Sequence, residues 1–156
     1  MAIYAAFIRG IMPTNPNHAN AKLRAVFEGL GFTNVRTVIT SGNILFESDS
    51  KSVAALESKI EKALSAELGI TGAAHVRSKQ DLEALIKKDP FKGKSHSRET
   101  YLIVTFMKEK PRQTFNTIKV TEGEPPKFMN DLEKKYGKTI TTRTWKTIGR
   151  IVDKMP

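Results

Sequence analysis

The hydrophobic pattern along the first half of the chain alternates between the spacing of strands and the spacing of helices. Residues 3–9 carry apolar side chains on both faces of an extended chain, which predicts a central strand. A helix should follow, begun by Asn17 or Asn20 and ended by Gly31, because apolar residues recur at helical spacing between them. These apolar residues are Leu23, Val26, Phe27 and Leu30.

The next segments predict a hairpin, a second helix and a fourth strand. Residues 35–40 and 44–47 have the pattern of two strands, joined by the short polar turn of residues 41–43. A second amphipathic helix that ends at Gly69 and a strand over residues 73–77 complete the series. The resulting order, βαββαβ, is that of the ferredoxin-like unit, in which two helices cover one face of a four-stranded antiparallel sheet.

The second face of this sheet should also be covered. The first predicted strand is apolar on both faces and the third is continuously apolar, whereas a solvated face would alternate with polar residues. We therefore expect residues 78–156 to pack as a cover on the βαββαβ unit of residues 1–77. The whole chain, residues 1–156, is then a single α+β domain with a ferredoxin-like N-terminal unit and a smaller α/β C-terminal subregion.

The second half predicts the order helix, strand, helix and helix. Ser78 has the sequence context of a helix cap, and residues 101–107 form a strongly apolar strand. Residues 127–136 have helical spacing, and Thr141 or Thr142 should cap a final helix.

The composition is that of one soluble domain. With 156 residues, 39% of them hydrophobic and 27% charged, the chain can bury a single core without disulfides or a metal. It has no Cys, which excludes disulfides and thiolate zinc sites. The apolar opening over residues 3–8 is far too short to span a bilayer and no basic segment precedes it, so we expect a cytoplasmic protein with no membrane partner.

Positive charge is concentrated in the second half. The chain carries 26 Lys and Arg against 16 Asp and Glu, a net charge of +10. Residues 1–78 hold 8 basic and 6 acidic side chains (net +2), whereas residues 79–156 hold 18 and 10 (net +8). Such a field attracts polyanions at long range, which favours nucleic acid or a phosphate-bearing small molecule as partner. The alternative is a solvated surface that only keeps the protein soluble.

The common catalytic and cofactor-binding motifs are absent from the sequence. It contains no H-E-x-x-H, G-x-S-x-G or G-x-G-x-x-G pattern. Residues 93–95 end like a phosphate-binding loop, but Lys88 stands where the first glycine is required. The histidines lie in three different elements without the spacing of metal ligands, so we expect neither a metal nor a cofactor. They are His18, His75 and His96.

Six basic residues of the second half are candidates for an anion-binding surface. Four lie around Pro90 and Gly93, in a loop that cannot continue the preceding helix, and two lie on the last predicted helix. The loop would either clamp phosphates or serve as a mobile, solvated connection. The six candidates are Lys88, Lys92, Lys94, Arg98, Lys146 and Arg150.

A polar corner is predicted where the first and third strands meet. These strands should be adjacent and antiparallel, so Arg9 at the end of the first lies beside Asn43 at the start of the third. Arg143 should lie in the first turn of the last helix, where a cation opposes the helix dipole and suggests an anionic ligand or an acidic neighbour. We expect these residues to converge as a ligand site, with Ser41 beside Asn43 and Trp145 packed beneath as support. The alternative is that they only shape the turn and satisfy nearby carbonyl groups.

Several segments of the chain resemble a bacterial protein family. The similar segments are residues 3–11, 23–32, 35–37, 41–43 and 142–147. The family is the one catalogued as domain of unknown function 1697, and the resemblance implies an α+β fold with no established activity. The chain departs from the family pattern at Thr144, where members have Asn, and over residues 12–17, where members have a basic, glycine-containing segment.

The sequence leaves three classes of function open. The leading one is a small module that binds an anionic, phosphate-bearing ligand, either nucleic acid or a nucleotide. The first alternative is an enzyme acting on a small phosphorylated or carboxylated substrate, with Arg9 and Arg143 as clamps. In that case Ser41 or His18 would lie near the chemistry, but no general base is convincingly placed. The second alternative is a ligand-free oligomeric scaffold, and the oligomeric state is unknown.

Overall fold

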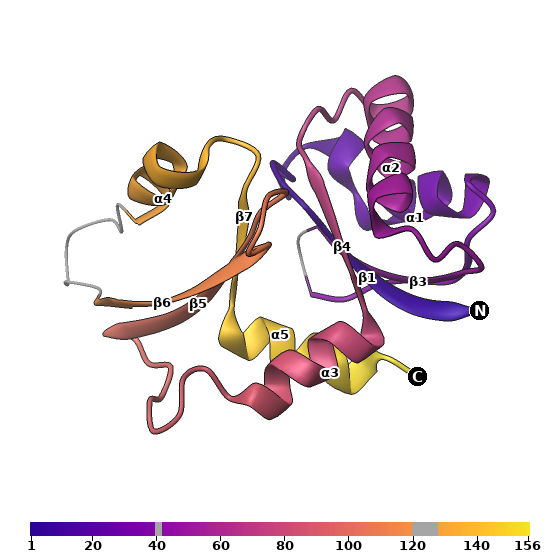
Figure 1. The fold of residues 1–156 in the computed structure, drawn as a ribbon. Helices are drawn as coiled ribbons and strands as arrows, with labels where there is room; N and C mark the ends of the chain where they lie inside the picture. The colour runs from indigo at the N-terminus through magenta and orange to yellow at the C-terminus, as the bar shows by residue number, and fades with distance from the viewer. Residues whose placement is uncertain (40–41, 120–127) are drawn as a thin grey trace.

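Two antiparallel sheets with helices around them form the structure (Figure 1). It is a computed structural model in which residues 1–39, 42–119 and 128–156 are described, and it confirms the predicted α+β class. No helix in these described ranges is both long and apolar enough to cross a membrane. The first sheet holds β1 (Ala2–Ile8), β2 (Thr33–Thr37), β3 (Asn43–Ser48) and β4 (Ala74–Ser78).

The first sheet is built from the predicted βαββαβ order. Helices α1 (Asn20–Gly29) and α2 (Val53–Leu68) cover one of its faces (Figure 1). The strand order is β2-β3-β1-β4 with antiparallel pairs, which confirms that the first and third strands are neighbours. Phe7 in β1 pairs with Asn43 in β3, so the end of the first strand lies beside the start of the third. The ferredoxin-like classification of this unit stays a prediction.

The start of α1 differs from the prediction. Neither Asn17 nor Asn20 caps this helix, since its N-cap is Ala19, whose side chain offers no acceptor. Asn15 instead caps a single 3-10 turn, η1 (Pro16–His18), by accepting a hydrogen bond from the backbone N–H of Asn17. The capping signal in the sequence therefore belongs to this short turn, which precedes the helix.

The second half of the chain covers the other face of the first sheet, as predicted. Helices α3 (Lys79–Lys88) and α5 (Trp145–Lys154) pack on that face (Figure 1). Phe7 and Leu45 of the first sheet share a buried cluster with these helices and with Phe106. The rings of Phe7 and Phe106 stack with their centroids 4.5 Å apart. Without residues 79–156 this apolar face would meet water, which favours aggregation.

A second sheet in the C-terminal half was not expected from the sequence. Its strands are β5 (Thr100–Phe106), β6 (Gln113–Lys119) and β7 (Thr141–Thr144), and a further helix is α4 (Phe128–Tyr136). The strand order is β6-β5-β7, so the predicted helix-strand-helix-helix order is wrong. The side chains of β6 and β7 are mostly polar and half-buried, so no apolar alternation marks them. Pairing with the apolar central strand β5 holds both in place.

The start of the last helix also differs from the prediction. Thr141 and Thr142 are expected to cap it, but both lie in β7, where they pair with β5. The N-cap is Thr144, whose hydroxyl accepts a hydrogen bond from the backbone N–H of Thr147 at 3.3 Å. Thr and Asn are both favoured N-cap residues, so Thr144 can fill the capping role of the Asn that the family resemblance implies here.

Candidate functional site

Arg143 joins the two sheets by donating its guanidinium N–H groups to oxygens of the protein. Its side chain leaves β7 and reaches the start of β3, where Nε donates to Asn43 Oδ1 at 2.6 Å. Nη2 donates to the backbone carbonyls of Ile8 and Gly42, at 3.1 and 3.2 Å. Since a guanidinium carries five N–H groups, two remain. Nη1 donates these two to Thr141 Oγ1 at 2.7 Å and to the Thr142 carbonyl at 3.0 Å.

This placement corrects the predicted setting of Arg143. The residue lies in a strand and not in the first turn of a helix, so the dipole argument for an anionic ligand does not apply. Its acceptors are neutral, and burial lowers the pKa of its guanidinium to about 10, so it stays charged at neutral pH. The Phe7 ring, with its centroid 5.7 Å from Arg143 Cζ, adds a cation–π contact.

Gly42 provides the space that Arg143 needs. Its φ is +78°, and a Cβ atom at this position would lie 2.8 Å from the Ile8 carbonyl and 3.3 Å from Nη2 of Arg143. Both the backbone conformation and the close approach therefore require glycine. In the turn motif at residues 41–43, Gly42 therefore leaves room for the Arg143 side chain.

Arg9 lies next to this contact but directs its guanidinium elsewhere. Nη1 donates to the Ile140 carbonyl at 2.6 Å, and Nη2 forms a hydrogen-bonded ion pair with Glu133 of α4. The two side chains are 25% and 22% exposed, so the pair is partly shielded from water. Asn43 and Arg143 thus meet as predicted, with the backbone of Arg9 beside them. Arg9 therefore has its carboxylate partner within the protein, and no contact joins its guanidinium to that of Arg143 in the described residues.

The remaining predicted members of the corner are Trp145 and Ser41. Trp145 is the first residue of α5 and packs against Phe91 and Phe115, whose ring centroids lie 5.4 and 6.2 Å from its own. It adjoins the buried cluster beneath α3 and α5. Ser41 lies outside the described residues. Ligand binding at this corner stays a prediction, and the contacts seen support a role in joining the sheets.

Near this contact, His75 and Lys108 also connect the first sheet to the second half of the chain, and no sequence pattern predicts them. His75 in β4 is fully buried, and its Nε2 donates to the Thr139 carbonyl at 2.7 Å. Burial and, to a smaller extent, nearby cations lower the pKa of His75 to about 3, so the ring is neutral at neutral pH. Lys108, after β5, donates to the Ala74 carbonyl. We call the four side chains at this place the junction residues, namely Arg9, His75, Lys108 and Arg143.

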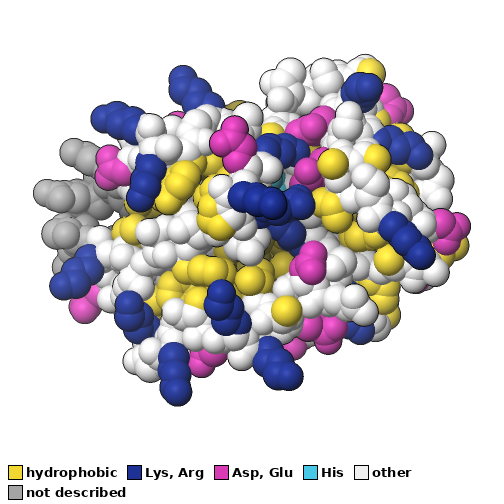
Figure 2. Space-filling view, in the orientation of Figure 1, with side chains coloured by type: hydrophobic (Ala, Val, Ile, Leu, Met, Phe, Trp, Pro, Cys, Tyr) yellow, Lys and Arg dark blue, Asp and Glu magenta, His cyan; other side chains and the backbone are white. Residues whose placement is uncertain are grey.

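The six predicted surface cations are all exposed, and we call them the basic surface. None of them forms an ion pair with a residue in the described part of the chain. Lys94 donates a hydrogen bond to Thr117 Oγ1 at 3.3 Å. Figure 2 shows Lys and Arg side chains spread over the visible face, including its left and lower parts. The members are Lys88, Lys92, Lys94, Arg98, Lys146 and Arg150.

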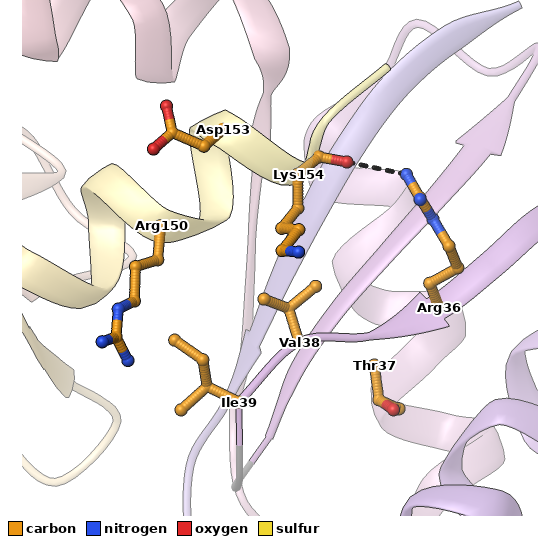
Figure 3. A pocket seen from close by; sticks show the side chains of 7 residues that line it. All are labelled: Arg36, Thr37, Val38, Ile39, Arg150, Asp153 and Lys154. Atoms are coloured by element: carbon orange, nitrogen blue, oxygen red, sulfur yellow. Dashed lines mark hydrogen bonds between the residues drawn. The ribbon is translucent and has the colours of Figure 1, made fainter.

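A cavity of about 520 Å³ lies between the end of β2 and the last turns of α5 (Figure 3), and we call it the cationic groove. Arg150 and Lys154 enter it from α5. Arg36 enters from β2, and its Nη2 donates to the Lys154 carbonyl at 2.7 Å. The carboxylate in its lining is that of Asp153. The full lining is Arg36, Thr37, Val38, Ile39, Arg150, Asp153 and Lys154.

Val38 and Ile39 form the apolar side of the cationic groove (Figure 3). The Ile39 side chain is exposed, and its φ is +56°, a conformation that β-branched residues rarely adopt. Strained backbone of this kind persists where the surrounding structure enforces it, and it is concentrated at functional sites. The sequence pattern contains no signal for the groove, because Arg36 and Arg150 are distant in the chain.

Comparison with known proteins decides the family. The family described as "Protein of unknown function (DUF1697)" matches residues 1–136. The chain belongs to the DUF1697 family. This confirms the resemblance, although the DUF1697 match ends before β7, which contributes Arg143, and before α5, which contributes three of the seven residues that line the cationic groove. Among proteins with curated descriptions, none matches the chain.

The DUF1697 fold is shared with a solved structure. The chain is similar to the structure described as that of conserved bacterial protein SP0830 from Streptococcus pneumoniae, with 23% sequence identity and a TM-score of 0.72. The alignment covers 97% of each chain. At this identity the likeness shows the fold alone. Because it spans nearly the whole chain, both sheets of this DUF1697 member belong to the shared architecture.

Proposed function

We propose that this DUF1697 protein binds an anionic, phosphate-bearing ligand, with nucleic acid as the leading class, along the cationic groove and the adjoining basic surface. The observation that carries the proposal is the lining of the groove, which holds three cations and one carboxylate beside the exposed Ile39 and the half-buried Val38. Cations of this kind hold phosphates, and aliphatic side chains contact sugars or bases.

The outer face of α5 extends the cationic groove into a longer track. Lys146, Arg150 and Lys154 are four residues apart, so they lie on one side of the helix with successive positions about 6 Å apart along its axis. Arg150 and Lys154 line the groove, and Lys146 continues the line of charge toward the N-terminus of the helix. A linear track favours a polymer of phosphates over a single nucleotide.

The basic loop between α3 and β5 adjoins this track. Phe91 in the loop packs against Trp145, the residue directly before Lys146 in the chain. The charges of the loop therefore add to the field at the start of α5. Contacts of this kind recognise the phosphate backbone and carry no base specificity. We place this binding in the cytoplasm, as the sequence predicts.

Fluorescence anisotropy with a short, labelled single-stranded RNA tests the proposal. The triple variant Lys146→Gln, Arg150→Gln, Lys154→Gln should bind about tenfold more weakly than the parent protein at about 50 mM salt. Each phosphate contact on a single strand contributes about 0.7 to the slope of log K against log salt, so the slope should fall by about 2 in magnitude.

A matched variant removes the same charge from the first half of the chain. Lys22→Gln, Lys51→Gln, Lys62→Gln alters exposed side chains outside the track and should change the affinity by less than about threefold. Equal weakening by both triple variants would show that only net charge matters. If the parent protein does not bind RNA at low salt, nucleic acid is removed as the ligand.

A further inference from the structure

A second cavity, of about 300 Å³, lies between α2, α3, β4 and the turn that joins β5 to β6. Two guanidinium groups line it, from Arg77 of β4 and Arg112 of the turn. Asp81 and Gln113 are the other polar residues in its lining. The cavity shares no residue with the cationic groove, so what it binds does not depend on the function proposed above.

Arg77 is held rigidly in the wall of this cavity. Its side chain is 3% exposed, and Nη1 and Nη2 donate to the carbonyls of Val76 and Arg112, both at 2.8 Å. The guanidinium also lies over the Phe106 ring, with Cζ 5.1 Å from the centroid. Its Nε has no acceptor among the described residues. A buried donor without an acceptor is costly, and a bound oxyanion would remove that cost.

Arg112 is the more exposed partner of this pair. Its side chain is 42% exposed, and its Nε also lacks an acceptor in the described part of the chain. Nη2 lies 4.0 Å from the Glu57 carboxylate, which is too long for a hydrogen bond. Most of the N–H groups of Arg112 are therefore available, and the long side chain can adjust its position over a ligand.

The cations around this cavity outnumber the buried carboxylates that could neutralise them. Glu57 is shared by Arg77 at 3.5 Å, Lys108 at 3.4 Å and Arg112 at 4.0 Å. Glu61 forms a second ion pair with Lys108, with Nζ 3.2 Å from Oε2. Asp81 is solvent-exposed, so water screens its charge. Burial, together with the nearby charge of Arg112, lowers the pKa of Arg77 to about 10, so Arg77 stays protonated at neutral pH.

We propose that this cavity binds a small oxyanion, a carboxylate or a phosphate group, between the guanidinium groups of Arg77 and Arg112. A guanidinium matches both kinds of oxyanion because its planar N–H groups can donate two parallel hydrogen bonds. Arg77 provides a fixed donor and Arg112 closes over the anion. The volume is at the lower limit of small-molecule pockets, which restricts the ligand to the size of a small metabolite.

Calorimetric titration of the full chain with inorganic phosphate and, separately, with succinate tests this site. At least one of the two should bind saturably, and the one that does identifies the class of oxyanion. Arg112→Gln should weaken that binding at least tenfold. The control is Lys110→Gln, in the same turn but outside the cavity lining, and it should keep the dissociation constant within about twofold.

A second variant, Arg112→Lys, keeps the test valid if Arg112→Gln fails to fold. It keeps the positive charge but loses the planar fork, so binding should be weakened to a level between the parent protein and Arg112→Gln. The proposal is overturned if neither anion binds saturably to the parent protein. It is also overturned if folded Arg112→Gln and Arg112→Lys both bind with the parent dissociation constant.

Discussion

The junction between the two sheets and the basic surface both depend on Lys and Arg, but they use them differently. At the junction, Arg143 and Lys108 reach across to backbone carbonyls of the opposite sheet, and Arg9 pairs with Glu133. On the basic surface, none of the six cations has an ion-pair partner in the described ranges. One group of charges connects elements of the fold, and the other faces solvent.

This difference teaches that the net charge of +10 overstates what is available to a ligand. A guanidinium with all its N–H groups bonded to the protein has none left for a phosphate. Exposed, unpaired cations contribute little to stability, but they create the field that attracts polyanions. Variants at the junction should therefore change the free energy of unfolding, while variants of the basic surface should change binding.

The largest expected effect is at Arg143. Arg143→Met removes the donor from five acceptors, several of them buried, and should lower the free energy of unfolding by about 3 kcal/mol. Urea unfolding followed by circular dichroism measures the change. Lys146→Met is the matched control, because it removes an exposed cation from a neighbouring position and should cost less than about 0.5 kcal/mol. Similar losses in both variants would break the distinction between the two regions.

The next effect is a dependence of stability on pH that originates at His75. Its pKa is lowered to about 3 in the folded protein, first by burial and then by Lys108, Arg77 and Arg143. The unfolded chain takes up a proton near pH 6.5 and the folded one does not, so His75 favours unfolding as the pH falls below 6.5. Between pH 8 and pH 5 this should lower the free energy of unfolding by about 2 kcal/mol.

Other groups also titrate in this range, so the test of His75 is a comparison. Urea unfolding of the parent protein and of His75→Gln at both pH values isolates the contribution of the imidazole. The glutamine amide can still donate to the Thr139 carbonyl, and it does not titrate. The parent protein should lose about 2 kcal/mol more than the variant on acidification. Equal losses would mean that the buried ring does not carry this dependence.

The sequence predicts the first sheet better than the second because burial marks its strands. Residues 3–9 are apolar on both faces, and the structure packs both faces against helices. In contrast, β6 and β7 have polar side chains and are strands only because β5 pairs with them. A one-dimensional pattern contains no information on that pairing.

The candidate sites show the same limit. The contact between Asn43 and Arg143 follows from the strand order together with the shared motif segments, although the expected helix dipole plays no part in it. The cationic groove is not predictable, since its walls are distant in sequence and the positive φ of Ile39 has no residue signature. The cavity at Arg77 and Arg112 is hidden for the same reason.

The smallest expected change in the free energy of unfolding is at Arg9. This residue is a junction residue, but it is more exposed than Arg143 and so lies between the junction and the basic surface in character. Its ion pair with Glu133 is partly exposed, so Arg9→Met should lower the free energy of unfolding by about 1 kcal/mol. Arg24→Met is the control, since its pair with Glu28 is more than half exposed and should be worth only about 0.3 kcal/mol.

A double-mutant cycle decides between a structural and a ligand-binding role for Arg9. If Arg9 mainly joins the sheets, Arg9→Met and Glu133→Gln each destabilise the protein, and the double variant loses less than the sum of the two. If Arg9 is instead kept for an anion, Arg9→Met leaves stability unchanged and abolishes phosphate binding at the corner. Because Nη1 of Arg9 also donates to the Ile140 carbonyl, the structural role predicts that Arg9→Met is the more harmful of the two single changes.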